Sequence, residues 1–406
     1  NVITGLLIAG LMIGNEFDPA GSWAMATAIA GIGIFFAAIA AVTAQIFESA
    51  RAANSLAAVA IGVAFILRAL GDGLATVAPD GLSASSMWLS WLSPFGWGQQ
   101  MHPFMDTTWL PVGLYVISFI ALVGTAFYLT AHRDVGQGIL PARRGSARAA
   151  SSLLSPLGLA RRLQKGTLIG WGVTATILGA IFGVTAVEFQ DFFTENEQFA
   201  EIIADMGGTG NMTDVFFSAM MGFMAFAIAA YGLQALLRAR SEETSGHLEP
   251  VLATATSRQR WLFSHYGYVV AGIVLLSLLS GLAAGVAYVL VADAAWSEVF
   301  RLTTASLVQI PAILVLIGLV TAAFGLIPRL TIAVGWGLFA AFFLVLQFGG
   351  LLNLPEWTLK LSPFTHTPAA PADDISIVPL GVLLGVAVSL ALLGFAFFRR
   401  RDLTTS

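Results

Sequence analysis

The sequence predicts an all-α, polytopic membrane protein, on the basis of its composition and the length of its apolar runs. Of the 406 residues, 57% are hydrophobic and 10% are charged, against about 25% charged residues in an ordinary soluble domain. The apolar residues fall into runs of roughly 20, the length at which a helix crosses a hydrocarbon core. These runs lack the alternating pattern of β-strands, and lipid requires backbone polar groups to bond internally. They are therefore predicted to be helices.

The apolar runs give nine complete spans and one short run at the start of the chain. The short run covers 1–14, and the complete spans are predicted at 24–45, 54–75, 112–131, 167–186, 214–237, 263–291, 304–326, 330–350 and 378–398. Glycines four residues apart in these runs are predicted to mark close helix packing. They are Gly10/Gly14, Gly179/Gly183 and Gly281/Gly285.

Basic residues gather in alternate loops, which sets the predicted orientation of the chain. All of the 19 lysines and arginines except Arg68, Arg301 and Lys360 lie near 51, in 133–165, in 238–260, at 329 or in 399–401. The opposite loops carry most of the acids, including a cluster over 188–214. We therefore expect the basic loops and the carboxyl terminus on the cytoplasmic side of a bacterial cell membrane.

Short motifs recur in the same order along the chain, which predicts a tandem repeat. Val42-Thr43-Ala44 returns as Val320-Thr321-Ala322, and Ser93-Pro94-Phe95 returns as Ser362-Pro363-Phe364. Both copies have the same predicted direction across the membrane, so the repeat is parallel. We expect 1–138 to be the C-terminal part of a first six-helix unit (the end of its third span and spans 4–6), 139–166 a cytoplasmic linker with an amphipathic helix, and 167–406 a complete second unit. The first unit would then lack two spans and a cytoplasmic loop.

Some connecting segments are predicted to have structure of their own. Residues 147–166 are basic and amphipathic, which favours a helix lying in the inner membrane interface; the alternative is a plain basic linker. Residues 188–212 combine acids with spaced apolar residues, and we expect an external helix there. Residues 76–111 and 351–377 both contain Ser-Pro-Phe. Because proline interrupts a helix, each is predicted to form a broken pair of short helices in the outer leaflet.

The basic loop 240–258 holds the pattern most informative about function. Read alone, it is a short polar helix that links two membrane helices. It also resembles the coupling loop of type-two ABC exporter permeases, and the residues that carry the resemblance are Arg240, Glu243, Gly246, Leu248, Glu249, Leu252, Ser257 and Arg258. The preceding stretch 155–171 is similar to the start of the second half in fused, two-unit actinobacterial permeases of the polyketide-antibiotic (tetronasin-type) exporters.

This resemblance implies that the repeated unit is an ABC exporter permease unit whose coupling helix docks on an ATPase subunit. The implied docking residues are Glu242, Glu243, Gly246, His247, Leu248, Glu249, Pro250 and Leu252. The implied partners are two copies of a separate ATPase, which would hold ATP and Mg, together with the lipid bilayer and a hydrophobic small molecule, and no nucleic acid. Pro250 departs from the family pattern, so a kinked helix is expected.

The sequence offers no catalytic motif of its own. It lacks the Gly-x-x-x-x-Gly-Lys-Ser/Thr sequence of a P-loop and has no cysteine. Its five histidines are scattered without metal-ligand spacing. No catalytic, cofactor-binding or metal-ligating residue is predicted, and the chain is expected to be a transport subunit rather than an enzyme.

Two groups of residues are candidates for a substrate path. Methionine and aromatic side chains suit apolar ligands of varied shape, and the candidates of this kind, with one amide, are Phe217, Met220, Met221, Met224, Phe343 and Gln347. Contact with lipid or a neighbouring helix is the competing explanation for each. Arg68 and Asp72 stand four residues apart within a span, where a mutual ion pair competes with a role in substrate contact.

These observations predict the transmembrane subunit of an ATP-driven exporter of hydrophobic or amphiphilic small molecules, such as antibiotics or drugs. Three alternatives stay open. One is an ABC permease for a lipid or glycan. Another is an ion-coupled secondary transporter, which would need titratable groups near the bilayer centre. The third is a membrane scaffold that transports nothing or a lipid-modifying enzyme, and the lack of a polar constellation argues against the enzyme.

Overall fold

The computed structural model describes residues 1–73, 76–77, 84–85, 88–134, 137–140, 148–195, 212–349 and 355–402. The chain divides into two units, unit 1 (Asn1–Ala147) and unit 2 (Arg148–Ser406). The division falls within the predicted linker 139–166. Most of the predicted external helix at 188–212 lies outside the described residues.

Unit 1 consists of helices with one small two-stranded sheet. Its elements are α1 (Val2–Gly14), α2 (Pro19–Ile46), α3 (Ala50–Gly73), β1 (Thr76–Val77), β2 (Ala84–Ser85), η1 (Trp88–Leu92), α4 (Pro94–Gln99) and α5 (Leu110–Ala131). The strands pair antiparallel, with Thr76 opposite Ser85. α2 lies at the centre of this unit because it packs against α1, α3, α4 and α5.

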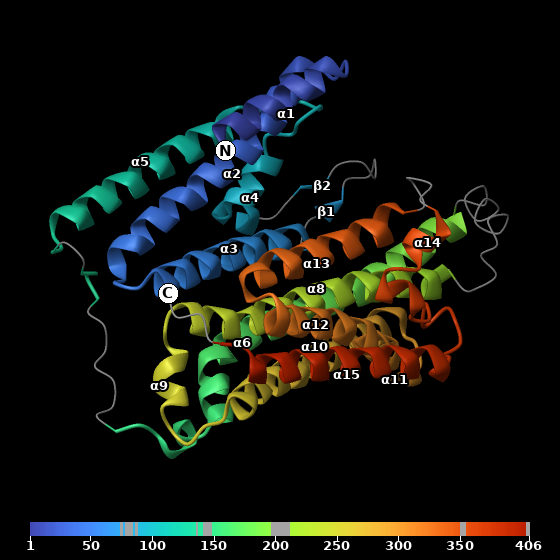
Figure 1. Cartoon of the computed structure of the whole chain (residues 1–406). Helices are drawn as coiled ribbons and strands as arrows, with labels where there is room; N and C mark the ends of the chain where they lie inside the picture. Colours follow the sequence, from blue (N-terminus) through green and yellow to red (C-terminus); the bar gives the residue numbers. More distant parts are fainter. Residues whose placement is uncertain are drawn as a thin grey trace. The chain divides into compact units, whose positions relative to one another are not determined.

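The regular elements in the described part of unit 2 are all helices. Its elements are η2 (Ser151–Leu154), α6 (Pro156–Glu195), α8 (Met212–Thr244), α9 (Leu248–Leu252), α10 (Arg258–Ala292), α11 (Ser297–Val308), α12 (Ile310–Leu326), η3 (Pro328–Leu330), α13 (Thr331–Phe348), α14 (Glu356–Leu359), η4 (Pro363–His366) and α15 (Ile377–Arg400). The long helices α8, α10, α12 and α15 run side by side (Figure 1).

The all-α, polytopic fold class is confirmed. The described residues contain nine helical segments long and apolar enough to cross a membrane, in the positions predicted for the nine spans, and the shorter apolar helix α1. The span predicted at 304–326 begins at Ser297 and is divided into α11 and α12. Pro311, in the first turn of α12, accounts for the division because it cannot donate a hydrogen bond to the helix before it.

The amphipathic stretch before the fourth complete span belongs to α6. The helix continues from Pro156 to Glu195 without interruption, so the predicted interfacial helix and the following span form one element. In Figure 1 the first turns of α6 run across the direction of the neighbouring helices of this unit. That is the orientation that a helix lying in the membrane interface requires.

The two Ser-Pro-Phe segments form short, interrupted helices in their described parts, as predicted. Ser93 separates η1 from α4; its hydroxyl accepts from the Phe95 N–H at 3.3 Å and donates to the Ala64 carbonyl at 2.6 Å. In the second segment, Ser362 separates α14 from η4, and Phe364 stacks on Phe226 with ring centroids 4.2 Å apart. Both segments therefore contact neighbouring helices, the first through Ser93 on α3 and the second through Phe364 on α8.

Helices that the sequence repeat makes equivalent also pack in equivalent pairs. In unit 1, α2 packs against α3, α4 and α5; in unit 2, α12 packs against α13, η4 and α15. Val42-Thr43-Ala44 lies in α2, and Val320-Thr321-Ala322 lies in α12. Both copies of the motif therefore lie in a helix that packs against the next span, the Ser-Pro-Phe segment and the last span of its own unit.

Close packing of α6, α10 and α11 depends on glycine. A methyl group added at Gly183 would overlap the Ala284 carbonyl oxygen of α10, and one added at Gly281 would lie 2.6 Å from the Thr303 Cα of α11. The predictions for Gly179/Gly183 and Gly281/Gly285 are thus confirmed. The prediction for Gly10/Gly14 is wrong for this structure, since no described atom lies within 4 Å of a methyl group placed at either position.

We expect Gly183→Ala to lower the free energy of unfolding of the detergent-solubilised protein by about 1–3 kcal/mol, the cost of overpacking. Gly170→Ala is a matched control in the same helix, because nothing lies within 4 Å of its added methyl group. The control should be neutral or stabilise α6, since alanine favours the helix. Thermal unfolding followed by circular dichroism measures both, and equal midpoints for the two variants would contradict the proposed helix contact.

Candidate functional site

The loop between α8 and α10 begins with the last turns of α8, where Glu242 and Glu243 lie. The chain leaves α8 through Gly246, whose positive φ of 74° favours glycine. α9 then covers only Leu248–Leu252, and Pro250 lies in its first turn, where a helix needs no N–H donor. Pro250 is therefore accommodated without the expected kink. Ser257 caps α10 by accepting from the Arg260 N–H at 3.2 Å.

Glu243 is the centre of a buried ionic cluster. Only 2% of its side chain is exposed, and its carboxylate oxygens lie 2.6 and 2.8 Å from the two terminal nitrogens of Arg401. A further nitrogen, from Arg240, lies 3.0 Å away. Such a two-pronged arginine–carboxylate pair fixes orientation as well as distance. We call Glu243, Arg240 and Arg401 the loop anchor.

The loop anchor joins four helices of unit 2. Arg401 directly follows α15, and its guanidinium lies 5.0 Å from the ring centroids of both Phe324 on α12 and Phe398 on α15. Arg258, the first residue of α10, donates to the Arg401 carbonyl at 2.6 Å. The end of α8 is thereby held to α10, α12 and α15 at one point.

Beside the loop anchor, an apolar cluster holds α9. Leu248 is buried in it, and Leu252 and Val251 pack at its edge. The other buried members are Ala239, Trp261, Leu262, Phe324 and Phe398. Glu243 and Leu248 were both implied as docking residues. In the structure they instead hold the loop against its own unit.

The other face of the loop is open. Gly246, His247, Glu249 and Pro250 are exposed. Glu242 is mostly buried beneath them, 2.7 Å from Arg238 and 3.6 Å from His247. Of the eight residues implied as docking positions, three are buried, four are exposed and Leu252 is half-buried. The buried residues fix the loop, and the exposed ones are accessible to another molecule.

The substrate-path candidates on α8 and α13 lie mainly in helix contacts. Phe217 and Met221 are buried in a cluster with Ala284, Leu302 and Ala305, and Met220 packs at its edge. Met224 belongs to the main core of unit 2, where Phe343 is partly buried and lies 5.4 Å from Phe226. Gln347 is exposed. Packing therefore accounts for all of these candidates except Gln347, and a role in substrate contact stays a prediction.

Arg68 and Asp72 form the ion pair that their spacing predicts, with a nitrogen–oxygen distance of 3.0 Å. Asp72 also accepts from Ser90 at 3.2 Å and from Gln99 at 3.4 Å. The pair thereby connects α3 to η1 and α4. Sequence reasoning did not find Ser90 and Gln99, because no local spacing relates them to Asp72.

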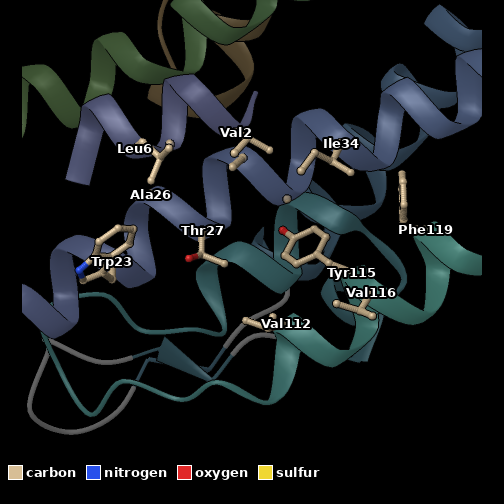
Figure 2. A pocket seen from close by; sticks show the side chains of 13 residues that line it. Val2, Leu6, Trp23, Ala26, Thr27, Ile34, Val112, Tyr115, Val116 and Phe119 are labelled. Atoms are coloured by element: carbon tan, nitrogen blue, oxygen red, sulfur yellow. The ribbon is translucent and has the colours of Figure 1, made fainter. Parts of the chain in front are cut away.

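An apolar cavity of about 520 Å³ lies in unit 1 and is lined by α1, α2 and α5. Figure 2 shows the side chains that line it. Val2, Trp23, Ile34 and Phe119 line it, and Tyr115 lies beside it with its hydroxyl bonded to the Pro94 carbonyl at 2.6 Å. No pattern in the sequence predicts this cavity, because its lining residues are ordinary apolar members of three different helices. Its chemistry suits a hydrocarbon ligand.

Comparison with known proteins identifies the family. The family described as "Multidrug efflux system permease Rv1217c, C-terminal domain" matches residues 153–399. The multidrug efflux system permease protein Rv1217c of Mycobacterium tuberculosis (strain ATCC 25618 / H37Rv) is 35% identical over 402 residues, which cover 99% of this chain and 71% of that protein. Neither match supports the narrower resemblance to tetronasin-type exporters. With its full-length similarity and its apolar helices in the predicted order, the chain belongs to the multidrug efflux system permease family represented by Rv1217c.

Proposed function

We propose that this chain is the transmembrane subunit of an ABC-type exporter that moves hydrophobic or amphiphilic small molecules out of a bacterial cell. Family membership supports a permease for efflux. In this proposal, energy comes from two copies of a separate ATPase subunit that hold ATP and Mg, and the loop around α9 is the contact through which unit 2 receives it.

The two-sided structure of the loop carries the proposal. A segment that passes force from a soluble partner to membrane helices needs a free face for the partner and a rigid attachment to the helices. Gly246, His247, Glu249 and Pro250 provide the exposed face, and the loop anchor provides the attachment.

The distribution of charge supports a cytoplasmic position for this loop. Arg258 and Arg401 meet at the loop end of unit 2, where the positive-inside rule places arginine. At the other end of α8, Asp214 lies 2.6 Å from Arg301 on α11, which also pairs with Glu298 at 2.7 Å. In the connecting segments at this end of unit 2, aspartate and glutamate outnumber lysine and arginine, as expected for the outer side of the membrane.

The cavity of unit 1 supports an apolar cargo. Its walls are mostly hydrocarbon, and pockets of about this size bind drug-sized molecules. The name of the relative, a multidrug efflux permease, agrees with a cargo selected by polarity rather than by a single structure.

Single-cysteine labelling tests the orientation, because the chain has no cysteine of its own. In intact cells, Asp374→Cys should react with a membrane-impermeant maleimide and Glu249→Cys should not. Glu249→Cys should react once the membrane is permeabilised. Both positions are exposed, so access to the side chain is not limiting. Labelling of Glu249→Cys in intact cells would place the loop outside and contradict the proposal.

We expect Glu249→Arg to reduce ATP-dependent drug uptake into inside-out vesicles by at least about tenfold, equivalent to about 1.4 kcal/mol of lost interaction. The vesicles contain the permease together with the ATPase subunit that co-purifies with it. Glu249 is exposed, so the change should reverse charge at the docking face without disturbing the fold.

Glu356→Arg is the matched control for this experiment, since Glu356 is an acid on α14 whose side chain is 85% exposed. It should transport at the unmodified rate. Uptake that survives Glu249→Arg, or that a protonophore abolishes while ATP is held constant, would argue for an ion-coupled transporter instead.

Glu243→Gln should destabilise the protein by about 3–5 kcal/mol, because it leaves the buried guanidinium of Arg401 without its opposite charge. Arg401→Gln should cost less, since Arg240 still pairs with Glu243. Glu356→Gln breaks an exposed pair with Lys360 and should change stability by less than about 1 kcal/mol. Thermal unfolding in detergent ranks the three variants. Equal midpoints would show that the loop anchor does not hold the loop.

A further inference from the structure

A groove of about 510 Å³ lies between α10 and α15 at the loop end of unit 2. It shares no residue with the loop anchor or with the substrate-path candidates. Its walls are Phe263 and Tyr266 from α10, and Val388, Ala391, Leu392 and Phe395 from α15, and its end is formed by Gln259 and Arg260.

The walls of the groove are hydrocarbon that the unit itself leaves uncovered. Phe263 is 67% exposed and Leu392 is 62% exposed. Phe395 packs between two aromatic rings, with centroids 6.3 Å from Phe263 and 5.7 Å from Tyr266. From residue 388 to 395 the groove follows α15 for about 10 Å at the rise of an α-helix. That length accommodates part of an extended hydrocarbon chain.

The end of the groove is positively charged. Arg260 lies in the first turn of α10, and within the described residues its exposed side chain forms no ion pair. Nearby, Arg258 donates to the Arg401 carbonyl, and the Arg401 guanidinium is paired with Glu243. Arg399 and Arg400, both exposed, end α15 at the same end of the unit. The positive end of the α10 helix dipole adds to this field.

We propose that this groove binds an anionic phospholipid, with an acyl chain along Leu392 and Phe395 and the phosphate at Arg260. A soluble anion would not use the apolar walls, and an uncharged hydrocarbon would not use the arginine. Basic pockets between membrane helices bind anionic headgroups, and the planar guanidinium matches phosphate oxygens in pairs. Placement in the inner leaflet rests on the proposed function; binding itself does not.

The bound lipid would lie next to the loop. Phe395 packs against the apolar cluster that holds α9, so a chain in the groove lies directly behind that cluster. Any ligand that binds only the folded state stabilises it. Anionic phospholipid should therefore raise the thermal midpoint of unit 2 as well as bind to it.

Native mass spectrometry of the full chain, titrated with dioleoylphosphatidylglycerol or dioleoylphosphatidylcholine, tests the proposal. The unmodified protein should bind the first lipid in preference to the second. Arg260→Gln should weaken phosphatidylglycerol binding about fivefold, the effect of about 1 kcal/mol for one basic residue at a membrane surface. Arg329→Gln is the control, because Arg329 is also exposed at this end of the unit but does not line the groove.

A second pair of variants tests the groove itself. Leu392→Trp should fill part of it and weaken phosphatidylglycerol binding by about as much, whereas Leu393→Trp should not. Leu393 is its exposed neighbour and does not line the groove. Equal binding of the two lipids, equal effects of Arg260→Gln and Arg329→Gln, or full binding by Leu392→Trp would each overturn the proposal. None of these measurements uses the ATPase or transport. Lipid binding can therefore be disproved while the efflux function stands, and the efflux function can be disproved while lipid binding stands.

Discussion

The buried carboxylate of Glu243 is the constraint on which the loop end of unit 2 depends. A charge removed from water is stable only when opposite charge and hydrogen bonds replace its hydration. Here Arg401 approaches both carboxylate oxygens and Arg240 adds a third contact. These contacts fix the position of the loop. If the end of α8 moved, Glu243 would separate from Arg401, which follows α15.

The sequence predicted the spans well because lipid imposes a simple rule on them. A run of apolar residues of sufficient length must be a helix, whatever its neighbours. Loops follow no comparable rule. Glu243 looks like an exposed docking residue in the sequence pattern, yet it is buried by an arginine 158 residues away. No local spacing contains that information, so the division of the loop into a fixed face and a free face emerges only from tertiary packing.

The glycine pairs show the same limit in the spans. Gly281 and Gly10 each begin a pair of glycines four residues apart, but Gly281 lies against the backbone of α11, while no described atom lies near a methyl group placed at Gly10. A small residue permits close approach without requiring it. Similarly, Phe217, Met221 and Met224 have the composition of an adaptable binding surface, and the structure buries them in helix contacts. Residue type describes what a surface can bind, and packing determines whether the surface is available.

Under the proposed function, the loop anchor also determines which helices respond to a partner. α8, α10, α12 and α15 meet at the anchor, and α12 and α15 also pack along their lengths. Displacement of α9 therefore moves these helices as one block, since interdigitated helices do not slide independently without losing their contacts. α13 is different, because most of its surface is exposed and it takes no part in the anchor. Relative motion within unit 2 should then occur where α13 meets α8 and α12. There, Phe226 packs against Phe339 and Phe343 through ring contacts that can shift without breaking any ion pair.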